Sequence, residues 1–436
     1  MVQSRLNIVI VGGGIGGLFA ANALAAQGFT VAVYEQAPAI GEIGAGVFLT
    51  PNSVRHLQRI GLEPAVEKWG ARVGPASRYF RHDGAPIAPV QVTDSSGWNA
   101  TFGMHRADLV EMLASALPAG VIHTGHRCTG FEQDGNIARV SFANGASAKA
   151  DIVVAADGIH SELRPHVFAS SQPVFSGSVA YRGLVPHDRV PDWPTDRWQM
   201  WLGKGRHFLA FPVRAGKLIN YVGFVPTDEQ MKESWSAPGD PDVLRQAFAG
   251  WDPRIEQLLK EVQLTFRWAL YDREPLPVWT RQRLCLLGDA AHPMLPHLGQ
   301  GANQSIEDGM ALATILTRAD PTSAPRALLA YERLRRERVA QVQRGARENG
   351  LRYDSAYSDL GVRDAEITAQ PPSASGSMTT MWSQMHKRLR QRWRKGGPEE
   401  LRWRLKHRRR VGSRPQSQRS RRGDDRSATG WCAATN

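Results

Sequence analysis

The sequence predicts an α/β fold in which a parallel sheet covered by helices is interrupted by an inserted antiparallel sheet. Three short apolar segments, each followed by a glycine-containing turn and a helix-like stretch, indicate the parallel sheet. Between them, residues 174–279 form short aromatic-rich segments separated by turn residues, a texture typical of antiparallel strands. The chain of 436 residues is long enough for more than one domain.

The first apolar segment opens a βαβ unit. Residues 6–11 (LNIVIV) read as a buried strand, followed by a glycine-rich turn, an alanine-rich helix and a second strand, TVAVY. In the turn, Gly12 permits a tight bend, Gly14 lets a pyrophosphate approach the backbone, and Gly17 lets helix and strand pack closely. Glu35 follows the second strand, where a carboxylate can bind both hydroxyls of an adenosine ribose. The unit therefore predicts dinucleotide binding.

Two further apolar segments end in acidic turns. The segment IVVAA ends at Asp157, and LCLL leads into Gly288 and Asp289. A Pro-rich loop then reaches Gly299 and Gly301, which open a helix whose first backbone N–H groups are available to an anion or a polarised carbonyl. An Asp beside a Gly is often only a turn signal. Because the arrangement recurs, it favours a ligand shared by these turns.

Arg106 stands near the start of another helix, HRADLVEMLASAL. It either contacts the phosphates of the ligand or makes a surface salt bridge, and the spacing does not decide between the two. Before it come a glycine-punctuated loop at residues 41–46 and a helix that begins near Pro51. Residues 121–142 read as short strands around a turn.

The inserted region, which includes one helical segment around residues 241–262, contains residues suited to a substrate. His207 lies on the strand RHFLAF, and Arg182 lies on an earlier strand. His207 either acts as a base or packs within an aromatic sheet. Arg182 either binds an acidic substrate or forms a salt bridge.

The C-terminal part changes character twice. A helix over residues 324–349 carries many Arg and Glu and is predicted to lie on the solvated outside. From residue 368 the chain becomes low in complexity and then basic. Residues 387–436 hold 17 Lys and Arg against 4 Asp and Glu, so they carry the whole net charge of +13. A disordered tail, a nucleic-acid-binding tail and a frameshifted C-terminus stay open, and no specific nucleic acid is expected.

Composition favours a soluble enzyme, with 42% hydrophobic and 22% charged residues. The 3 cysteines lie far apart, which argues against a disulfide framework and a thiolate metal site. His292 and His297 lack partners at metal-ligand spacing, so no metal is predicted. No signal peptide or membrane-length apolar run is present, and a cytoplasmic location is expected.

The three motifs GGGIGG with Glu35, ADGIHSELR and GDAAHPMLPHLGQGANQSIEDG resemble, in order and separation, those of the single-component FAD-dependent aromatic hydroxylases. These are the para-hydroxybenzoate hydroxylase-like flavoprotein monooxygenases, and the resemblance covers residues 5–367. It is closest to the salicylate hydroxylase and 3-hydroxybenzoate 6-hydroxylase branch, with 6-hydroxynicotinate 3-monooxygenase also similar. It implies a discontinuous Rossmann-like FAD-binding domain (residues 1–173 and 280–367) around an inserted antiparallel β-sheet substrate domain (residues 174–279).

The resemblance also implies cofactor contacts. Gly12, Gly14 and Gly17 would cradle the FAD pyrophosphate, with Glu35 on the adenosine ribose and Asp289 on the ribityl chain. Four more residues would lie along the cofactor: Gly46 beside the flavin, Arg106 at the phosphates, the Cys128 backbone near the adenine, and Asp157 near FAD and the nicotinamide. The backbone from Leu298 to Asn303, with Gly299, Gly301 and Ala302, would stabilise the negative charge of the reduced flavin.

The implied reaction is hydroxylation of a small aromatic acid with NAD(P)H and O2 through a C4a-hydroperoxyflavin. A base that removes the proton of a ring hydroxyl assists oxygen transfer. His207 and His297 match active-site histidines of the related enzymes and are expected to be catalytic.

Arg182, Phe211 and Pro296 are expected to contact the substrate. Phe48 and Phe211 replace a His and a Tyr of the hydroxynicotinate enzymes, which leaves a more apolar pocket suited to a benzoate-type ligand. The alternatives are a heteroaromatic substrate of the 6-hydroxynicotinate type and epoxidation of a non-aromatic one. Monomer and homodimer both stay open.

Overall fold

The structure is a computed structural model that describes residues 6–41, 44–168, 173–227, 237–357 and 359–369. Its six-stranded sheet has the order β19-β20-β12-β1-β2-β8. The members are β1 (Asn7–Val11), β2 (Thr30–Tyr34), β8 (Ile122–His123), β12 (Ile152–Ala155), β19 (Thr280–Arg281) and β20 (Leu284–Leu286). All neighbours pair in parallel except β19 and β20, so the predicted parallel sheet is confirmed.

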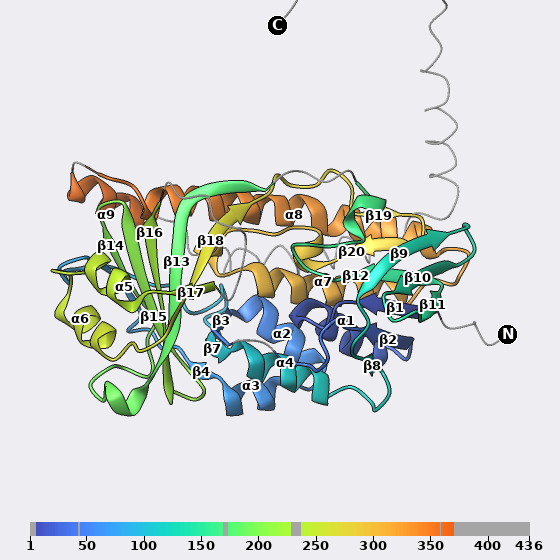
Figure 1. Cartoon of the computed structure of the whole chain (residues 1–436), viewed down its shortest axis with the longest axis horizontal. Coiled ribbons are helices and arrows are strands. Elements are labelled where there is room, and N and C mark those ends of the chain that lie inside the picture. The colour runs from blue at the N-terminus through green and yellow to red at the C-terminus, as the bar shows by residue number, and fades with distance from the viewer. Residues whose placement is uncertain (1–5, 42–43, 169–172, 228–236, 358, 370–436) are drawn as a thin grey trace, which may run out of the picture. The chain divides into compact units, whose positions relative to one another are not determined.

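Helices α1 (Ile15–Ala26) and α7 (Gly301–Leu316) lie beside this sheet and pack closely against each other (Figure 1). A Cβ atom at Gly309 would lie 2.9 Å from the Phe19 ring and 3.0 Å from Ala20 Cα. A glycine in mid-helix therefore sets the distance between the two helices.

Short elements surround this centre. The helices are α2 (Pro51–Arg59), α3 (Glu63–Trp69) and α4 (Arg106–Ser115). One three-stranded sheet contains β3 (Gly46–Leu49), β4 (Ala71–Arg72) and β7 (Phe102–His105), and another contains β9 (Cys128–Gln133), β10 (Ala138–Phe142) and β11 (Ser147–Ala150). The helix-like stretch expected after the turn at Asp157 is only the 3-10 turn η1 (Arg164–His166).

The second large sheet has eight strands in the order β17-β18-β13-β16-β15-β14-β5-β6. Most belong to the predicted inserted region: β13 (Val174–Pro186), β14 (Gln199–Gly203), β15 (Arg206–Val213), β16 (Leu218–Pro226), β17 (Ala237–Gly239) and β18 (Thr265–Asp272). Two come from earlier in the chain, β5 (Arg78–Arg81) and β6 (Pro86–Pro89). Since β14 pairs in parallel with β5, the sheet is mixed at this point and antiparallel elsewhere.

One face of this sheet is covered by α5 (Pro241–Ala247) and α6 (Pro253–Lys260), where the sequence predicted one helical segment. Leu244, Phe248 and Leu258 pack there against the buried rings of Trp201 and Phe208. Each helix begins with an aspartate whose side chain accepts a hydrogen bond from the backbone two residues later. The 3-10 turn η2 (His187–Arg189) follows β13.

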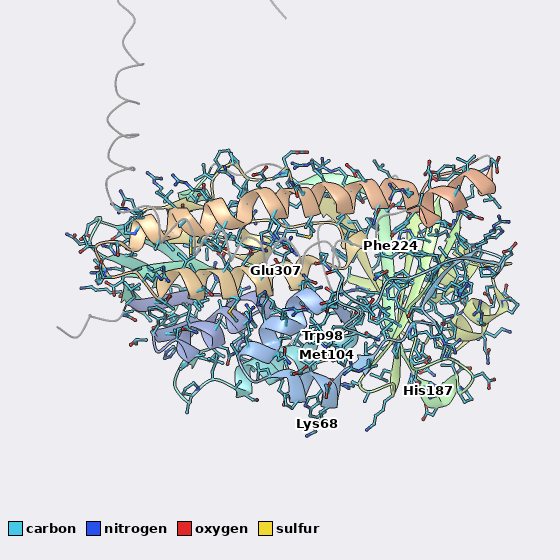
Figure 2. The ribbon with its side chains drawn as sticks, turned by 180° about the vertical axis from the view of Figure 1, so that it is seen from behind. Lys68, Trp98, Met104, His187, Phe224 and Glu307 are labelled. Atoms are coloured by element: carbon cyan, nitrogen blue, oxygen red, sulfur yellow. The ribbon has the colours of Figure 1, made fainter. Side chains whose placement is uncertain are left out.

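The long helix α8 (Ala324–Tyr353) runs above α7 and reaches both large sheets, and α9 (Leu360–Thr368) follows it (Figure 1). The expectation of a solvated outer helix is wrong for one face of α8, where Arg335 is fully buried and Glu332 is nearly so. Arg335 is buried because Glu307 and Asp308 of α7 pair with it, and Glu307 is labelled in Figure 2. Glu332 is buried because its carboxylate accepts hydrogen bonds from Trp279 N and Thr280 N. Of the predicted basic tail, residues 370–436 lie outside the described residues. No described helix is long and apolar enough to span a membrane.

Candidate functional site

Four strands of the parallel sheet end at one edge with the polar groups singled out in the sequence. The glycine-rich turn follows β1, Glu35 follows β2, Asp157 lies beyond β12, and Asp289 lies beyond β20. Because these strands are parallel, their carboxyl ends share an edge. The structure therefore brings together motifs that are far apart in the chain.

The three glycines of the turn have different roles. A Cβ atom at Gly12, whose φ is +109°, would lie 2.2 Å from the Ala156 carbonyl oxygen, and one at Gly17 would lie 2.0 Å from the Gly12 carbonyl oxygen. At Gly14 a Cβ atom would meet nothing within 4 Å. The fold itself requires Gly12 and Gly17, whereas Gly14, the N-cap of α1, borders open space at a helix N-terminus.

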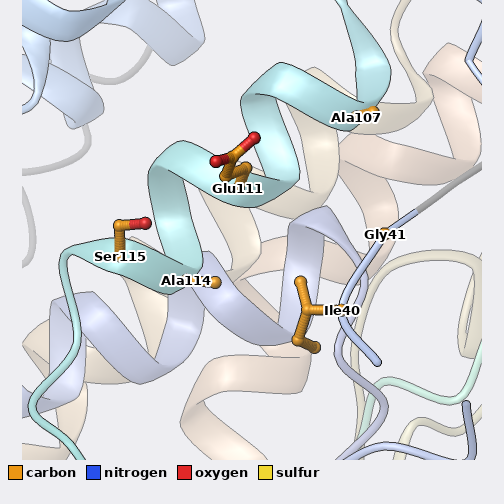
Figure 3. Close-up of a pocket in the computed structure, with 6 residues that line it drawn as sticks. All are labelled: Ile40, Gly41, Ala107, Glu111, Ala114 and Ser115. Carbon is orange, nitrogen blue, oxygen red and sulfur yellow. The ribbon is translucent and has the colours of Figure 1, made fainter. Parts of the chain in front are cut away.

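Glu35 is held at this turn by two backbone donors. Its Oε2 accepts a hydrogen bond from Gly13 N at 2.6 Å, and its Oε1 accepts one from Ala37 N at 2.8 Å. The carboxylate is therefore fixed in orientation beside the glycine-rich turn. Close by, a pocket of about 410 Å³ separates the loop at Ile40 and Gly41 from α4 (Figure 3).

The two turns that contain Asp157 and Asp289 are linked by buried Arg164, which also donates from Nη2 to the Gly158 carbonyl at 3.3 Å. Arg164 donates from Nε to the Ala290 carbonyl at 2.7 Å and from Nη2 to the Asp289 carbonyl at 2.9 Å. Asp157 Oδ2 accepts from Leu163 N at 3.2 Å, while its Oδ1 is buried without a hydrogen-bond partner among the described residues. Burial raises the pKa of Asp157. A ligand donor at Oδ1 would satisfy this atom.

Arg106 and Cys128 lie near the same edge. Arg106 begins α4, and burial lowers its pKa although the charge of Asp289 opposes this. Burial raises the pKa of the Cys128 thiol, and the negative charge of Asp157 raises it further. Arg106 is therefore within electrostatic range of Asp289, and Cys128 within that of Asp157.

The N-terminus of α7 is fixed by the side chain of Asn303. Its Nδ2 donates to the Phe48 carbonyl at 2.8 Å and the Gly299 carbonyl at 2.7 Å, and its Oδ1 accepts from Thr50 N at 3.0 Å. Gly299 has the left-handed conformation, with φ +61°. The side chain of Asn303 thus orders the loop, and the backbone N–H groups of the first turn of α7 are what this segment offers a ligand.

A buried ion network beneath this turn was not foreseen. Arg335 binds Glu307 Oε2 and Asp308 Oδ1, each at 2.6 Å, and Asp308 Oδ2 lies 2.5 Å from His292 Nε2 and 3.2 Å from Gly288 N. Burial alone would raise the pKa of Glu307, but the charges of Arg335 and Arg338 outweigh it and hold the pKa below its usual range. His292 therefore has a structural partner. The only sequence signal of this network was the pair of adjacent acids, Glu307 and Asp308, in α7.

His207 and His297 face each other between the second sheet and the loop before α7. Their ring centroids are 5.3 Å apart, and both rings are buried. Phe224 stacks on His207 at 3.9 Å with an interplanar angle of 12°. Nε2 of His207 and Nδ1 of His297 have no hydrogen-bond partner among the described residues. Burial, reinforced by His207, lowers the pKa of His297 to about 3.

Asp354, directly after α8, is a site residue that sequence reasoning missed. Its Oδ1 lies 2.7 Å from His207 Nδ1, and its Oδ2 accepts from Ser178 Oγ at 3.0 Å. Burial raises its pKa, but the charge and hydrogen bond of His207 outweigh that, so the pKa is lowered overall. No motif surrounds Asp354, and 147 positions separate it from its partner.

The sheet face next to His207 keeps an accessible apolar stretch. Residues 207, 209 and 211 of β15 pair with residues 224, 222 and 220 of β16, and alternate residues share a face. Leu209 and Val222 stay partly exposed although the pairs on either side are buried. Phe211 meets Phe48 edge-on at 5.6 Å, and Asn220 Nδ2 is buried without a partner among the described residues.

Arg182 is directly opposite Val222 on the neighbouring strand, and so it borders the same stretch. Its side chain is buried, and its guanidinium lies 5.9 Å from the Trp268 ring centroid. Burial, with the charge of Arg106, lowers its pKa to about 10, which leaves it cationic at neutral pH. Pro296 precedes His297 in the 3-10 turn η4 (Pro296–Leu298).

Known proteins resemble the chain over most of its length. A family model described as an FAD binding domain matches residues 5–346. A 3-amino-4-hydroxybenzoate 2-monooxygenase of Streptomyces platensis is 39% identical over 80% of this chain and 89% of its own length. A 6-hydroxynicotinate 3-monooxygenase of Bordetella bronchiseptica is 37% identical over 80% and 92%. A salicylate hydroxylase of Pseudomonas putida is 38% identical over 82% and 88%.

Solved structures agree with these relatives. A salicylate hydroxylase substrate complex superimposes with a TM-score of 0.73 and 30% identity, over 84% of this chain and 93% of that one. The HpxO protein of Klebsiella pneumoniae, complexed with FAD and uric acid, gives 0.72 and 31%, over 84% and 92%.

Proposed function

Because the chain belongs to the FAD-binding family of flavoprotein monooxygenases, we propose that it hydroxylates a small aromatic acid that carries a ring hydroxyl. The protein is an FAD-dependent monooxygenase whose homologues act on aromatic compounds. The proposal adds the substrate class, salicylate or 3-hydroxybenzoate in type, and NAD(P)H and O2 as co-substrates. We also propose a cytoplasmic location, because Cys128 and Cys285 are buried free thiols, as is usual in a reducing compartment.

The carboxyl edge of the parallel sheet fits FAD. The open space at Gly14, the unsatisfied Oδ1 of Asp157 and the cation Arg106 offer complementary groups to a pyrophosphate-linked dinucleotide. Glu35 would hold the adenosine ribose, and Asp289 would hold the ribityl chain. Bound FAD would supply the redox chemistry that takes reducing equivalents from NAD(P)H and activates O2.

The N-terminus of α7 would stabilise negative charge on the cofactor. Backbone N–H groups at Gly301, Ala302 and Asn303 point out of the first helical turn, and the helix dipole adds a positive potential there. Gly299, in the left-handed conformation, bends the chain directly before the first turn of α7. Gly46 lies at the start of the adjacent strand β3. These groups are fixed before the reaction, so they need no rearrangement when charge develops.

The substrate class is carried by a single observation: Nε2 of buried His207 has no hydrogen-bond partner among the described residues. A base at this position can take the proton of a ring hydroxyl and so increase electron density on the ring carbon that is oxidised. The apolar surface of Leu209 and Val222 accommodates an aromatic ring, and Arg182 beside it suits a carboxylate. His297 would contact the same hydroxyl as a neutral hydrogen-bonding group.

A heteroaromatic acid is the second candidate substrate, because the 6-hydroxynicotinate 3-monooxygenase is about as similar in sequence as the salicylate hydroxylase. Phe48 and Phe211 form an apolar edge-to-face pair at the end of the accessible stretch. This apolar pair suits the ring of a benzoate-type acid. A ring nitrogen would instead be bound by Asn220 Nδ2, which lies beside Phe211.

The test is substrate-stimulated NADH and NADPH oxidation by the full-length holoenzyme. Salicylate, 3-hydroxybenzoate, 3-amino-4-hydroxybenzoate and 6-hydroxynicotinate are compared, with unsubstituted benzoate as a control that lacks the hydroxyl. We expect a hydroxybenzoate to stimulate oxidation most and to yield an aromatic product with one new ring hydroxyl, formed either with the carboxylate retained (one oxygen atom heavier) or with the carboxylate lost as CO2. Hydroxylation of 6-hydroxynicotinate alone would favour the second candidate, and stimulation by none of the acids would overturn the proposal.

A further inference from the structure

We propose that Asp354 is a positioning residue that makes His207, rather than His297, the proton acceptor for the substrate hydroxyl. The inference rests on the proposed function and assigns different roles to the two histidines at that site. It comes from the surroundings of the two rings, because only one of them has a carboxylate within hydrogen-bond distance among the described residues.

The hydrogen bond fixes which nitrogen of His207 carries the proton. Asp354 stays ionised and accepts at Oδ1 from Nδ1 at 2.7 Å, so the neutral ring carries its hydrogen on Nδ1. Nε2 then presents a lone pair, and it is the nitrogen without a partner among the described residues. Asp354 therefore leaves the basic nitrogen available to a ligand.

The ring of His207 is also fixed in orientation. Phe224 stacks on one face at 3.9 Å, and His297 and Tyr353 lie at centroid distances of 5.3 and 5.4 Å. A 180° rotation of the ring about Cβ–Cγ would place carbon atoms at the positions of Nδ1 and Nε2 and would therefore break the hydrogen bond to Asp354. The lone pair on Nε2 is therefore aimed in one direction before the substrate binds.

His297 has no carboxylate within hydrogen-bond distance among the described residues. A Cβ atom at Gly350 would lie 2.6 Å from its Cδ2, so the backbone of α8 packs directly on the ring. Burial keeps it neutral, and the charge of Asp354 reaches it only as a weaker opposing influence. The titratable groups facing His207 are thus Asp354 and Tyr353 from the end of α8, and His297 from η4.

Proton uptake is balanced within this pair. The O–H bond of the substrate hydroxyl breaks, an Nε2–H bond forms on His207, and the resulting imidazolium is stabilised by the Asp354 carboxylate. The Asp354 side chain is 20% exposed whereas that of His207 is fully buried. The counter-charge therefore stays partly hydrated while the base is shielded from water.

The decisive variant is Asp354→Asn in the full-length holoenzyme, with Asp364→Asn as the matched control. Asp364 has a similar exposure of 16% and accepts a hydrogen bond from Arg81 Nε at 2.5 Å, outside the site. We expect kcat of Asp354→Asn to fall by about 100-fold, within the range of general-base contributions. KM should change much less, and Asp364→Asn should retain kcat. Asp354→Glu should restore part of the rate.

A substrate analogue isolates the proton step. With a fluorinated hydroxybenzoate whose hydroxyl is already ionised at the assay pH, Asp354→Asn and His207→Gln should both approach the wild-type rate. His297→Gln should not show this rescue, because its deficit does not come from proton removal. An equal loss with both substrates would overturn the inference, as would an unchanged kcat in Asp354→Asn.

A spectroscopic measurement keeps the inference testable without turnover. Nitrogen-15 NMR of labelled histidines in the wild-type holoenzyme should show His207 protonated at Nδ1, and this signal should change in Asp354→Asn but not in Asp364→Asn. If no aromatic acid stimulates the wild type, the proposed function fails while this pairing is still measured. A wild-type His207 protonated at Nε2 would contradict the inference directly.

Discussion

Gly14→Ser tests whether the carboxyl edge of the parallel sheet holds FAD. The added Cβ atom meets no protein atom within 4 Å, and the backbone at φ −77° and ψ −177° suits any L-residue. Serine is also a favourable N-cap, so the free energy of unfolding of the apoprotein should change by less than about 0.5 kcal/mol. The side chain would, however, occupy the space through which a pyrophosphate approaches the backbone.

The loss in affinity follows from the hydrogen bond that is blocked. A backbone donor to a charged group contributes about 1.5–3 kcal/mol, so FAD should bind about 10- to 150-fold more weakly. Isothermal titration of FAD into the apoprotein measures the affinity, and urea denaturation of the same apoprotein measures the stability. Both are compared with the wild type.

Gly17→Ser is the matched control. Its Cβ atom would lie 2.0 Å from the Gly12 carbonyl oxygen, which belongs to backbone that cannot move freely. We expect the apoprotein to lose about 2 kcal/mol or more of stability through overpacking. Full FAD affinity in Gly14→Ser would refute the assignment of the pyrophosphate site, and equal destabilisation of both variants would show that the open space at Gly14 belongs to the fold.

The remaining predictions concern the ion network, pH and the substrate cation. Arg335→Met leaves Glu307 buried without its main counter-charge and should cost about 3–5 kcal/mol in urea denaturation, whereas Arg333→Met at an exposed position of the same helix should cost less than about 1 kcal/mol; equal costs would contradict the network's role. The pKa of His297 is lowered to about 3 in the folded protein, so as the pH falls the unfolded chain takes up this proton at a higher pH than the folded chain does. The free energy of unfolding therefore decreases as the pH falls below the ordinary pKa of histidine. His297→Gln should therefore remove up to about 1.4 kcal/mol per pH unit from the acid-side slope between those two pKa values, and an unchanged slope would count against a neutral buried ring. Arg182→Gln should raise KM for the aromatic acid by about 10-fold or more, as expected for a lost charge-assisted contact, with little change for its carboxamide analogue; a parallel rise for both would argue against carboxylate binding.

Local features of the fold could be predicted from sequence because their causes are local. The strand, turn and helix around Gly12 follow from short-range patterns of apolar residues and glycines, and β2 and α2 begin where the sequence places them. The acidic turns at Asp157 and Asp289 could be placed at strand ends for the same reason. Their meeting at one edge followed from the order of a parallel sheet.

Features that depend on distant partners could not be predicted. The pairing of β14 with β5 joins segments more than a hundred positions apart and makes the sheet locally parallel. Arg335 looks like a solvent-facing residue of an amphipathic helix until Glu307 and Asp308 are found opposite it. Asp354 carries no motif at all, and only the folded chain shows that it supports His207.

The most direct test of the central claim is turnover under isotopically heavy O2. The full-length enzyme, loaded with FAD, is supplied with NADH and the hydroxybenzoate that stimulates it most, and the aromatic product is analysed by mass spectrometry. We expect the new hydroxyl of the product to carry the heavy oxygen. An unlabelled aromatic product, with the heavy oxygen recovered only in hydrogen peroxide, would contradict it.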